Sequence, residues 1–351
     1  MFLNPRTHVS LFLCIVIIAC CACHTSQGEE MRQLETVSSW FYYLDFEPDE
    51  TIMAQLAQST YDMIVMEPIF TDRENRDFPI AELVSRFHAA PHPKLVLAYI
   101  DIGQAENWRT YWQSDWSIGD PEWIVATDPD GWEGNFPVAY WHEEWHDIWL
   151  GDDGYLQAIL EAGFDGIYLD WVEAYSDEHV MTMAEQEHVD PREEMIWLIE
   201  DMAAFCRAQN PQFIVVGQNA AELAEYEAYL DVVDAIAQEQ TWFDGAADND
   251  PPGDCPLPRT DEDIETDAYE QSLSEACLQM YKDFPESTLH VSSEEYIRYL
   301  TRAREKGTII FTIDYALDPQ HVAWVYATSR ALGFVPFVSE RALSLYREPV
   351  E

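Results

Sequence analysis

The interpretation of the whole chain starts from one stretch, Gly163-Phe164-Asp165-Gly166-Ile167-Tyr168-Leu169-Asp170-Trp171-Val172-Glu173-Ala174-Tyr175. Its centre, Ile167-Tyr168-Leu169, consists of β-forming residues that follow a glycine, which predicts a short buried strand. Asp170 comes directly after that strand. A carboxylate at the carboxyl end of a strand lies where (β/α)₈ barrels hold their catalytic groups, although an aspartate there can also simply cap the next turn.

Short apolar segments alternate with amphipathic ones on both sides of this stretch. The alternation predicts an α/β fold, a single (β/α)₈ TIM barrel over residues 36–351, with a long acidic insert, Asp244–Val291, after strand seven. The fourth strand has the weakest pattern. The predicted strands are Trp40–Asp45, Asp62–Glu67, Lys94–Asp101, Phe136–Tyr140, Asp165–Asp170, Phe213–Gly217, Asp234–Glu239 and Thr308–Asp314.

The charge of the chain is strongly negative. Its 351 residues suit one barrel and a leader, and 18 Lys and Arg stand against 66 Asp and Glu, for a net charge of −48. Such a surface repels phosphate backbones, so nucleic acid is not expected as a partner. The sequence indicates no protein partner, and we expect a monomer.

Residues 1–23 have the pattern of an export leader. Arg6 precedes an apolar run that ends at Cys20, which is too short to span a membrane but typical of a signal peptide. Its last four residues, Ile17-Ile18-Ala19-Cys20, resemble a lipoprotein box in which Cys20 carries the lipid; cleavage after Ala22 and a short membrane anchor are the alternatives. Residues 24–35 are interpreted as a polar tether. We therefore expect an extracytoplasmic protein that is secreted or bound to the membrane only through its lipid.

Export also permits disulfides. Cys255 and Cys277 both lie in the acidic insert, and we expect them to pair. Cys206 lies in a segment with a helical pattern and is expected to be a buried thiol.

Polar side chains stand at the carboxyl ends of seven predicted strands. Because these ends meet at one mouth of a barrel, the side chains predict a shared cleft, and the aromatic residues between them favour a sugar as its ligand. In so acidic a chain the amides and aromatic residues carry more weight than the carboxylates. The strand-end residues are Asp45, Glu67, Asp101, Asp170, Gln218-Asn219, Glu239 and Asp314-Tyr315.

The chain resembles a known family at several of these places. The segment Val96–Glu106 and the following Arg109-Thr110-Tyr111-Trp112 resemble the third-strand signature of glycoside hydrolase family 114, and Gly163–Tyr175 is similar to its "GFDG…LD" strand. Gln104 departs from the pattern, since many relatives have glutamate there. The resemblance covers about residues 37–340 and implies a hydrolase of α-1,4-linked galactosamine-type polysaccharide that uses no cofactor. Further matching segments are Gln218-Asn219, Gln238-Glu239, Phe311–Tyr315 and Gly333–Pro336.

The resemblance implies that Asp170 and Glu239 form the catalytic pair. Glycoside cleavage needs one carboxyl that protonates the leaving oxygen and a second, ionised carboxylate that attacks the anomeric carbon or activates water. We expect Asp170 to be the nucleophile or stabilising carboxylate, kept charged by Asn219 and Arg109. We expect Glu239 to be the proton donor, with Trp242 beside it to raise its pKa. The substrate-binding residues expected are Asp45, Tyr99, Asp101, Arg109, Tyr111, Trp112, Tyr140, Asn219, Trp242, Asp314 and Tyr315.

A competing motif is His142-Glu143-Glu144-Trp145-His146, which matches the H-E-x-x-H pattern of zinc metalloproteases. Gly151 interrupts the helix that such a site needs, so we expect no metal. Asp128-Pro129-Asp130-Gly131 is only a fragment of a calcium loop and is interpreted as a turn. A polysaccharide-binding lipoprotein without catalytic activity is the other alternative.

Overall fold

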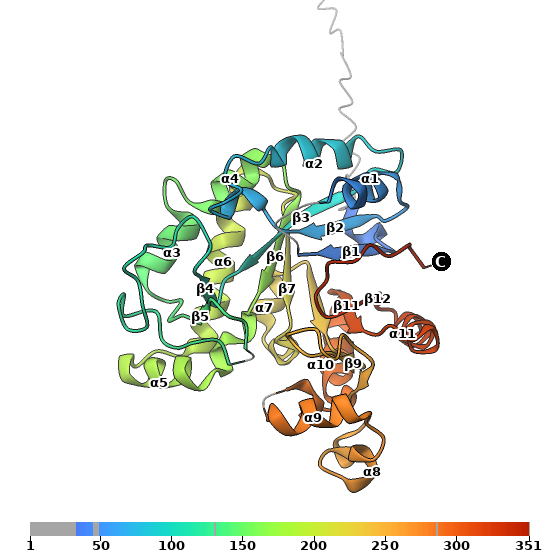
Figure 1. The fold of residues 1–351 in the computed structure, drawn as a ribbon. Helices are drawn as coiled ribbons and strands as arrows, with labels where there is room; N and C mark the ends of the chain where they lie inside the picture. Colours follow the sequence, from blue (N-terminus) through green and yellow to red (C-terminus); the bar gives the residue numbers. More distant parts are fainter. Residues whose placement is uncertain (1–32, 45–48, 130, 286, 351) are drawn as a thin grey trace, which may run out of the picture. The chain divides into compact units, whose positions relative to one another are not determined.

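The computed structural model of the chain describes residues 33–44, 49–129, 131–285 and 287–350 (Figure 1). The leader, Cys20 and Asp45 lie outside the described residues, as does the tether up to residue 32. All described residues belong to one compact unit. In this unit eight parallel strands form a nearly closed barrel with helices between them, which confirms the predicted (β/α)₈ fold.

Every neighbouring pair of barrel strands is parallel, as expected where helices connect successive strands. The order around the barrel follows the order in the chain. The strands are β1 (Trp40–Tyr43), β2 (Met63–Met66), β3 (Leu95–Asp101), β6 (Gly166–Asp170), β7 (Ile214–Gln218), β8 (Ala235–Glu239), β11 (Ile309–Tyr315) and β12 (Val335–Ser339).

One predicted strand is wrong and another was missed. The predicted strand Phe136–Tyr140 overlaps β5 (Asn135–Pro137), which pairs antiparallel with β4 (Gln104–Glu106), outside the barrel. The eighth barrel strand is instead β12, which contains Pro336. A proline lowers the strand signal but is tolerated here, because β12 is hydrogen-bonded in the sheet only to β11. Asp170 therefore ends the fourth barrel strand and Glu239 the sixth.

Aromatic side chains fill the barrel and close the gap between β1 and β12. The indole Nε1 of Trp40 donates to the carbonyl of Val335 at 3.0 Å, and its ring centre lies 5.7 Å from that of Phe337. The ring of Tyr42 lies 5.0 Å from that of Tyr168 in the same core. Because side chains fill the interior of the barrel, a functional site can form at its mouth, where the carboxyl ends of the strands lie.

Helices surround the barrel, and several begin at acidic caps. Asp190 accepts the N–H groups of Arg192 and Glu193 at the start of α6 (Pro191–Gln209), with a proline at the first helical position. No helix in the described part of the chain is long and apolar enough to cross a bilayer. The other helices are α1 (Glu50–Gln58), α2 (Ile80–His88), α3 (Glu143–Leu150), α4 (Tyr155–Ala162), α5 (Glu178–Glu187), α7 (Glu227–Val232), α8 (Asp267–Glu270), α9 (Glu275–Asp283), α10 (Ser293–Glu305) and α11 (Pro319–Ala331).

The insert after β8 is an ordered subdomain with a small core of its own (Figure 1). It contains β9 (Phe243–Asp244), β10 (Cys255–Pro256), α8 and α9. A disulfide joins Cys255 to Cys277, with the sulfur atoms 2.03 Å apart. Cys206, on α6, is a buried free thiol.

Candidate active site

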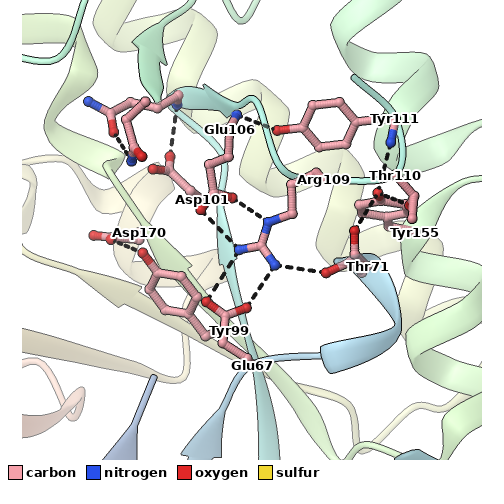
Figure 2. A network of polar contacts seen from close by, with 12 residues as sticks. Glu67, Thr71, Tyr99, Asp101, Glu106, Arg109, Thr110, Tyr111, Tyr155 and Asp170 are labelled. Atoms are coloured by element: carbon pink, nitrogen blue, oxygen red, sulfur yellow. Dashed lines mark hydrogen bonds and ion pairs between the residues drawn. The ribbon is translucent and has the colours of Figure 1, made fainter. Parts of the chain in front are cut away.

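Asp170 lies at the mouth with a donor on each carboxylate oxygen. The hydroxyl of Tyr99 on β3 donates to Oδ2 (Figure 2). The N–H of Trp171 donates to Oδ1 at 2.8 Å. Burial and, second, the negative charge of Glu239 raise the pKa of Asp170 to about 7. Asn219 and Arg109 were predicted to keep Asp170 charged, whereas this raised pKa favours its protonated form.

The backbone turns sharply after each of the strands β6, β7 and β8. Trp171, Asn219 and Gln240 have φ angles of 56°, 58° and 44°, in the left-handed region that non-glycine residues rarely adopt. Such backbone strain persists only where surrounding contacts hold it, and it gathers at functional sites. Here the turn after β6 brings the N–H of Trp171 onto the carboxylate that precedes it.

Glu239, at the end of β8, is surrounded by hydrogen-bond donors. The side-chain amide of Gln218 and the hydroxyl of Tyr315 donate to its two carboxylate oxygens. Asn219 Nδ2 lies 3.3 Å from Oε2, and Arg341 Nη1 lies 3.7 Å from Oε1. Donors of this kind stabilise an ionised carboxylate.

Trp242 does not supply the apolar surroundings that were predicted for Glu239. Its ring centre lies 5.1 Å from that of Trp324, and its Nε1 donates to Ser329 Oγ at 3.0 Å, so it packs against α11. Asp314 accepts two successive backbone N–H groups of this turn, at 2.6 and 3.0 Å, and burial raises its pKa to about 7. Both side chains support the turn after β8.

Asn219 links Glu239 to a third carboxyl group, that of Glu173. Asn219 Nδ2 donates to Glu173 Oε1 at 3.1 Å, while Asn219 Oδ1 accepts the N–H of Glu239 at 3.0 Å and the amide of Gln238 at 3.2 Å. Burial and the charge of Asp170 raise the pKa of Glu173 well above its usual range. Glu173 Oε2 is buried and has no hydrogen-bond partner among the described residues. Glu173, Asp170 and Glu239 are thus three neighbouring carboxyls at the mouth, where Arg341 lies near Glu239.

Arg109 lies in a buried ion cluster (Figure 2). Its Nη1 is 2.8 Å from Glu67 Oε2 and its Nε is 2.6 Å from Glu106 Oε2, and Nη1 also donates to Thr71 Oγ1 at 2.7 Å. Burial raises the pKa of Glu67 to about 7 although Arg109 lowers it. Glu67 and Glu106 share the charge of Arg109, which weakens the support predicted from it for an ionised Asp170; that role stays a prediction.

The structure brings three of the predicted substrate-binding residues, Tyr99, Asn219 and Tyr315, into contact with Asp170 or Glu239. Asp101 is the direct neighbour of Asp170 across the β3–β6 pairing. Its Oδ1 accepts the two N–H groups of the following turn, at 3.0 and 2.8 Å, so it also fixes the end of β3.

Three further predicted residues pack in the layers around the mouth. Trp112 stacks on Phe136 with ring centres 5.0 Å apart. The hydroxyl of Tyr111 accepts a backbone N–H at 2.8 Å. Tyr140 is fully buried and donates to the carbonyl of Pro191. These contacts are typical of structural aromatic residues, and other residues make the direct contacts with Asp170 and Glu239.

Three residues near the pair were not predicted from the sequence. Tyr42 donates to Gln218 Oε1 at 2.9 Å inside the barrel, which turns the amide N–H₂ toward Glu239. Arg341 follows β12. Because β12 was not predicted as a strand, Arg341 was not predicted as a residue at a strand end. Glu173 had a signal, since it is a carboxyl three residues after Asp170 in a short turn.

The two histidines of the H-E-x-x-H motif have separate surroundings. His142 Nε2 lies 3.1 Å from Glu187 Oε2. Burial lowers the pKa of His146, whose Nε2 has no hydrogen-bond partner in the part of the chain described. Across residues 33–44, 49–129, 131–285 and 287–350, no group of three or more His, Cys, Asp or Glu side chains is placed to hold a metal ion.

Two solved structures share this fold. The glycoside hydrolase domain of PelA from Pseudomonas aeruginosa superposes with a TM-score of 0.54 at 16% identity, over 88% of this chain and 97% of that one. Ega3 of Aspergillus fumigatus, in complex with galactosamine, gives a TM-score of 0.55 at 12% identity, over 88% and 92%.

Sequence comparisons place the chain in a family. An uncharacterized protein of Deinococcus radiodurans is 31% identical over 294 residues, which cover 84% of this chain and 78% of that protein. Another, from Thermotoga maritima, is 26% identical over 349 residues, 96% and 89% of the two chains. The sequence model of glycoside-hydrolase family GH114 matches residues 36–350. The chain therefore belongs to glycoside-hydrolase family GH114 and is a glycoside hydrolase.

Proposed function

We propose that this glycoside hydrolase cleaves α-1,4-linked galactosamine-type polysaccharide with Asp170 and Glu239 as its two catalytic carboxyls. The observation that carries the proposal is the pair itself, which lies at the ends of β6 and β8 with only β7 between them. The charge of Glu239 helps to raise the pKa of Asp170 to about 7, so the pair retains one proton up to about neutral pH. One proton on two carboxyls provides both an acid and an ionised carboxylate.

Cleavage uses these two states together. The protonated carboxyl donates its proton to the glycosidic oxygen as the bond to the anomeric carbon breaks. The ionised carboxylate attacks that carbon, or takes a proton from the water that does so, and stabilises the positive charge on the sugar. Tyr99 and Gln218 hold the two carboxyls in place from the neighbouring strands β3 and β7.

The distribution of roles stays a prediction: Asp170 as nucleophile and Glu239 as proton donor. The exchanged roles, with Glu239 as nucleophile and Asp170 as proton donor, are also chemically possible, because burial and the charge of Glu239 raise the pKa of Asp170 to about 7. Azide rescue separates the two assignments. If Asp170 is the nucleophile, azide should restore turnover of Asp170→Ala with a glycosyl azide of inverted configuration, whereas Glu239→Ala should give the retained configuration. The reverse pattern would exchange the roles.

The choice of galactosamine has two supports. Ega3, which shares the fold, was solved with galactosamine. In addition, a polymer of free galactosamine is cationic, and a chain with a net charge of −48 attracts it.

Digestion of galactosamine polymers tests the proposal. De-N-acetylated and acetylated α-1,4-linked polymers, with other α-linked polysaccharides as controls, are incubated with the protein, and the products are identified by mass spectrometry. We expect galactosamine oligomers from the wild type and none from Asp170→Asn. Release of another sugar, or equal turnover by Asp170→Asn, would refute the substrate or the catalytic pair, respectively.

A further inference from the structure

An aromatic ring that no prediction included lies near Glu239. Trp132 belongs to the segment between β4 and β5, whereas Arg341 follows β12. The guanidinium carbon of Arg341 lies 5.4 Å from the ring centre of Trp132 and 4.7 Å from that of Tyr315. Arg341 Nη1 also lies 3.7 Å from Glu239 Oε1. A single guanidinium therefore joins Trp132 to the catalytic pair.

Hydrogen bonds fix both partners of this contact. The N–H of Arg341 donates to the carbonyl of Pro252 at 2.9 Å, which anchors the segment after β12 on the insert. Asp128 Oδ1 accepts the N–H of Trp132 at 2.8 Å, and Asp128 Oδ2 accepts the side-chain amide of Gln104 at 2.7 Å. Asp128 thus holds the backbone of Trp132 in place. Gln104, the departure from the family pattern, supplies the donor that a glutamate would lack.

Trp132 stays accessible although Arg341 covers part of it. Its side chain is 38% exposed, in a place where most large aromatic residues are buried. Trp197 is also exposed, at 52%, but it lies on α6 in the helical layer outside the barrel. An exposed indole beside a catalytic carboxyl offers a ligand a broad apolar face.

We propose that Trp132, backed by Arg341, is a binding platform for one galactosamine ring of the polymer, next to the sugar cleaved by the pair. This inference rests on the proposed function. Galactose-configured sugars present a face of C–H groups that packs on an indole ring, and a protonated amine is attracted to the same π face. Because Arg341 contacts both Trp132 and Tyr315, the platform has a fixed position relative to Glu239.

Binding measurements on an inactive protein test the platform. In the Asp170→Asn background, Kd is measured for α-1,4-linked galactosamine oligomers of increasing length. Trp132→Ala should raise Kd for the longer oligomers roughly three- to ten-fold, and Trp132→Phe by less. Trp197→Ala is the matched control and should leave Kd unchanged.

Kinetics of the otherwise wild-type protein give a second readout. Trp132→Ala should raise KM for the polymer by a similar factor and keep kcat within about two-fold, as expected when binding of the ground state and the transition state is lost equally. A lower kcat with unchanged Kd would show that Trp132 acts only by holding Arg341, and would overturn the platform. Unchanged Kd in Trp132→Ala would overturn it as well. If the Asp170→Asn parent binds no galactosamine oligomer, the proposed substrate itself is wrong, whatever Trp132→Ala does.

Discussion

Replacement of Tyr99 by phenylalanine should move the pH optimum of catalysis upward. The Tyr99 hydroxyl donates to Asp170 Oδ2, and this bond lowers the pKa of Asp170 against the larger effects of burial and of the charge on Glu239. A hydrogen bond to a charged group is worth about 1.5–3 kcal/mol, and about 1.4 kcal/mol corresponds to one pKa unit. Loss of the hydroxyl should therefore raise the pKa of Asp170 by roughly one to two units above 7.

The assay is the pH profile of kcat/KM on a galactosamine oligomer, measured well below KM. Its alkaline limb reports the loss of the last proton shared by the pair, so in Tyr99→Phe this limb should shift upward by about one to two units. Tyr140→Phe is the matched control, because Tyr140 donates to the carbonyl of Pro191 and not to a carboxylate. An alkaline limb that stays in place or moves downward in Tyr99→Phe would refute the reasoning.

The other predictions concern stability, the third carboxyl and the anchor. The pKa of Asp170 is about 7 in the folded protein and about 3.9 in the unfolded chain, so its ionisation disfavours folding as the pH rises through this interval. In urea unfolding at about pH 8, Asp170→Asn should therefore be more stable than the wild type by up to the order of 4 kcal/mol. Near pH 4 the variant should be no more stable than the wild type. Burial raises the pKa of Glu173 well above its usual range, which favours the neutral form that a glutamine resembles; Glu173→Gln should therefore keep kcat within a few-fold while Glu173→Ala loses more, and equal losses would contradict this. Removal of the disulfide by Cys255→Ser with Cys277→Ser, which lie 22 residues apart, should destabilise the protein by roughly 3 kcal/mol, and unchanged thermal unfolding would contradict this. Cys20→Ser should release the protein from membranes; a soluble wild type would indicate ordinary cleavage instead.

The barrel could be predicted because each strand carries its own local signal. Seven of the predicted runs of β-forming residues are barrel strands in the structure. The exceptions are weak for physical reasons. The segment 135–137 is short and pairs only with β4, and β12 contains a proline that a strand at the end of the hydrogen-bonded order accommodates.

The positions of the two carboxyls were equally predictable, but their surroundings were not. A residue at a strand end is placed at the mouth by topology alone, which is why Asp170 and Glu239 meet there. Trp242 follows Glu239 by three residues and yet points away, because the turn after β8 directs its ring against Trp324. Arg109 was expected beside Asp170, but Glu67 and Glu106 take its charge. Sequence proximity therefore said little about which charges lie next to one another.

The electrostatics of the pair depend instead on residues that are far away in the chain. Gln218 donates to Glu239, and the hydroxyl of Tyr42, on the first strand, donates to Oε1 of the same amide, which favours this orientation. Arg341 approaches Glu239 from beyond the last strand. A single sequence contains no local pattern for such contacts, since they form only when the barrel closes and brings the first and last strands together. It follows that variants of Tyr42 should alter the charge state of the pair without touching the substrate, which a strand-end argument alone would not suggest.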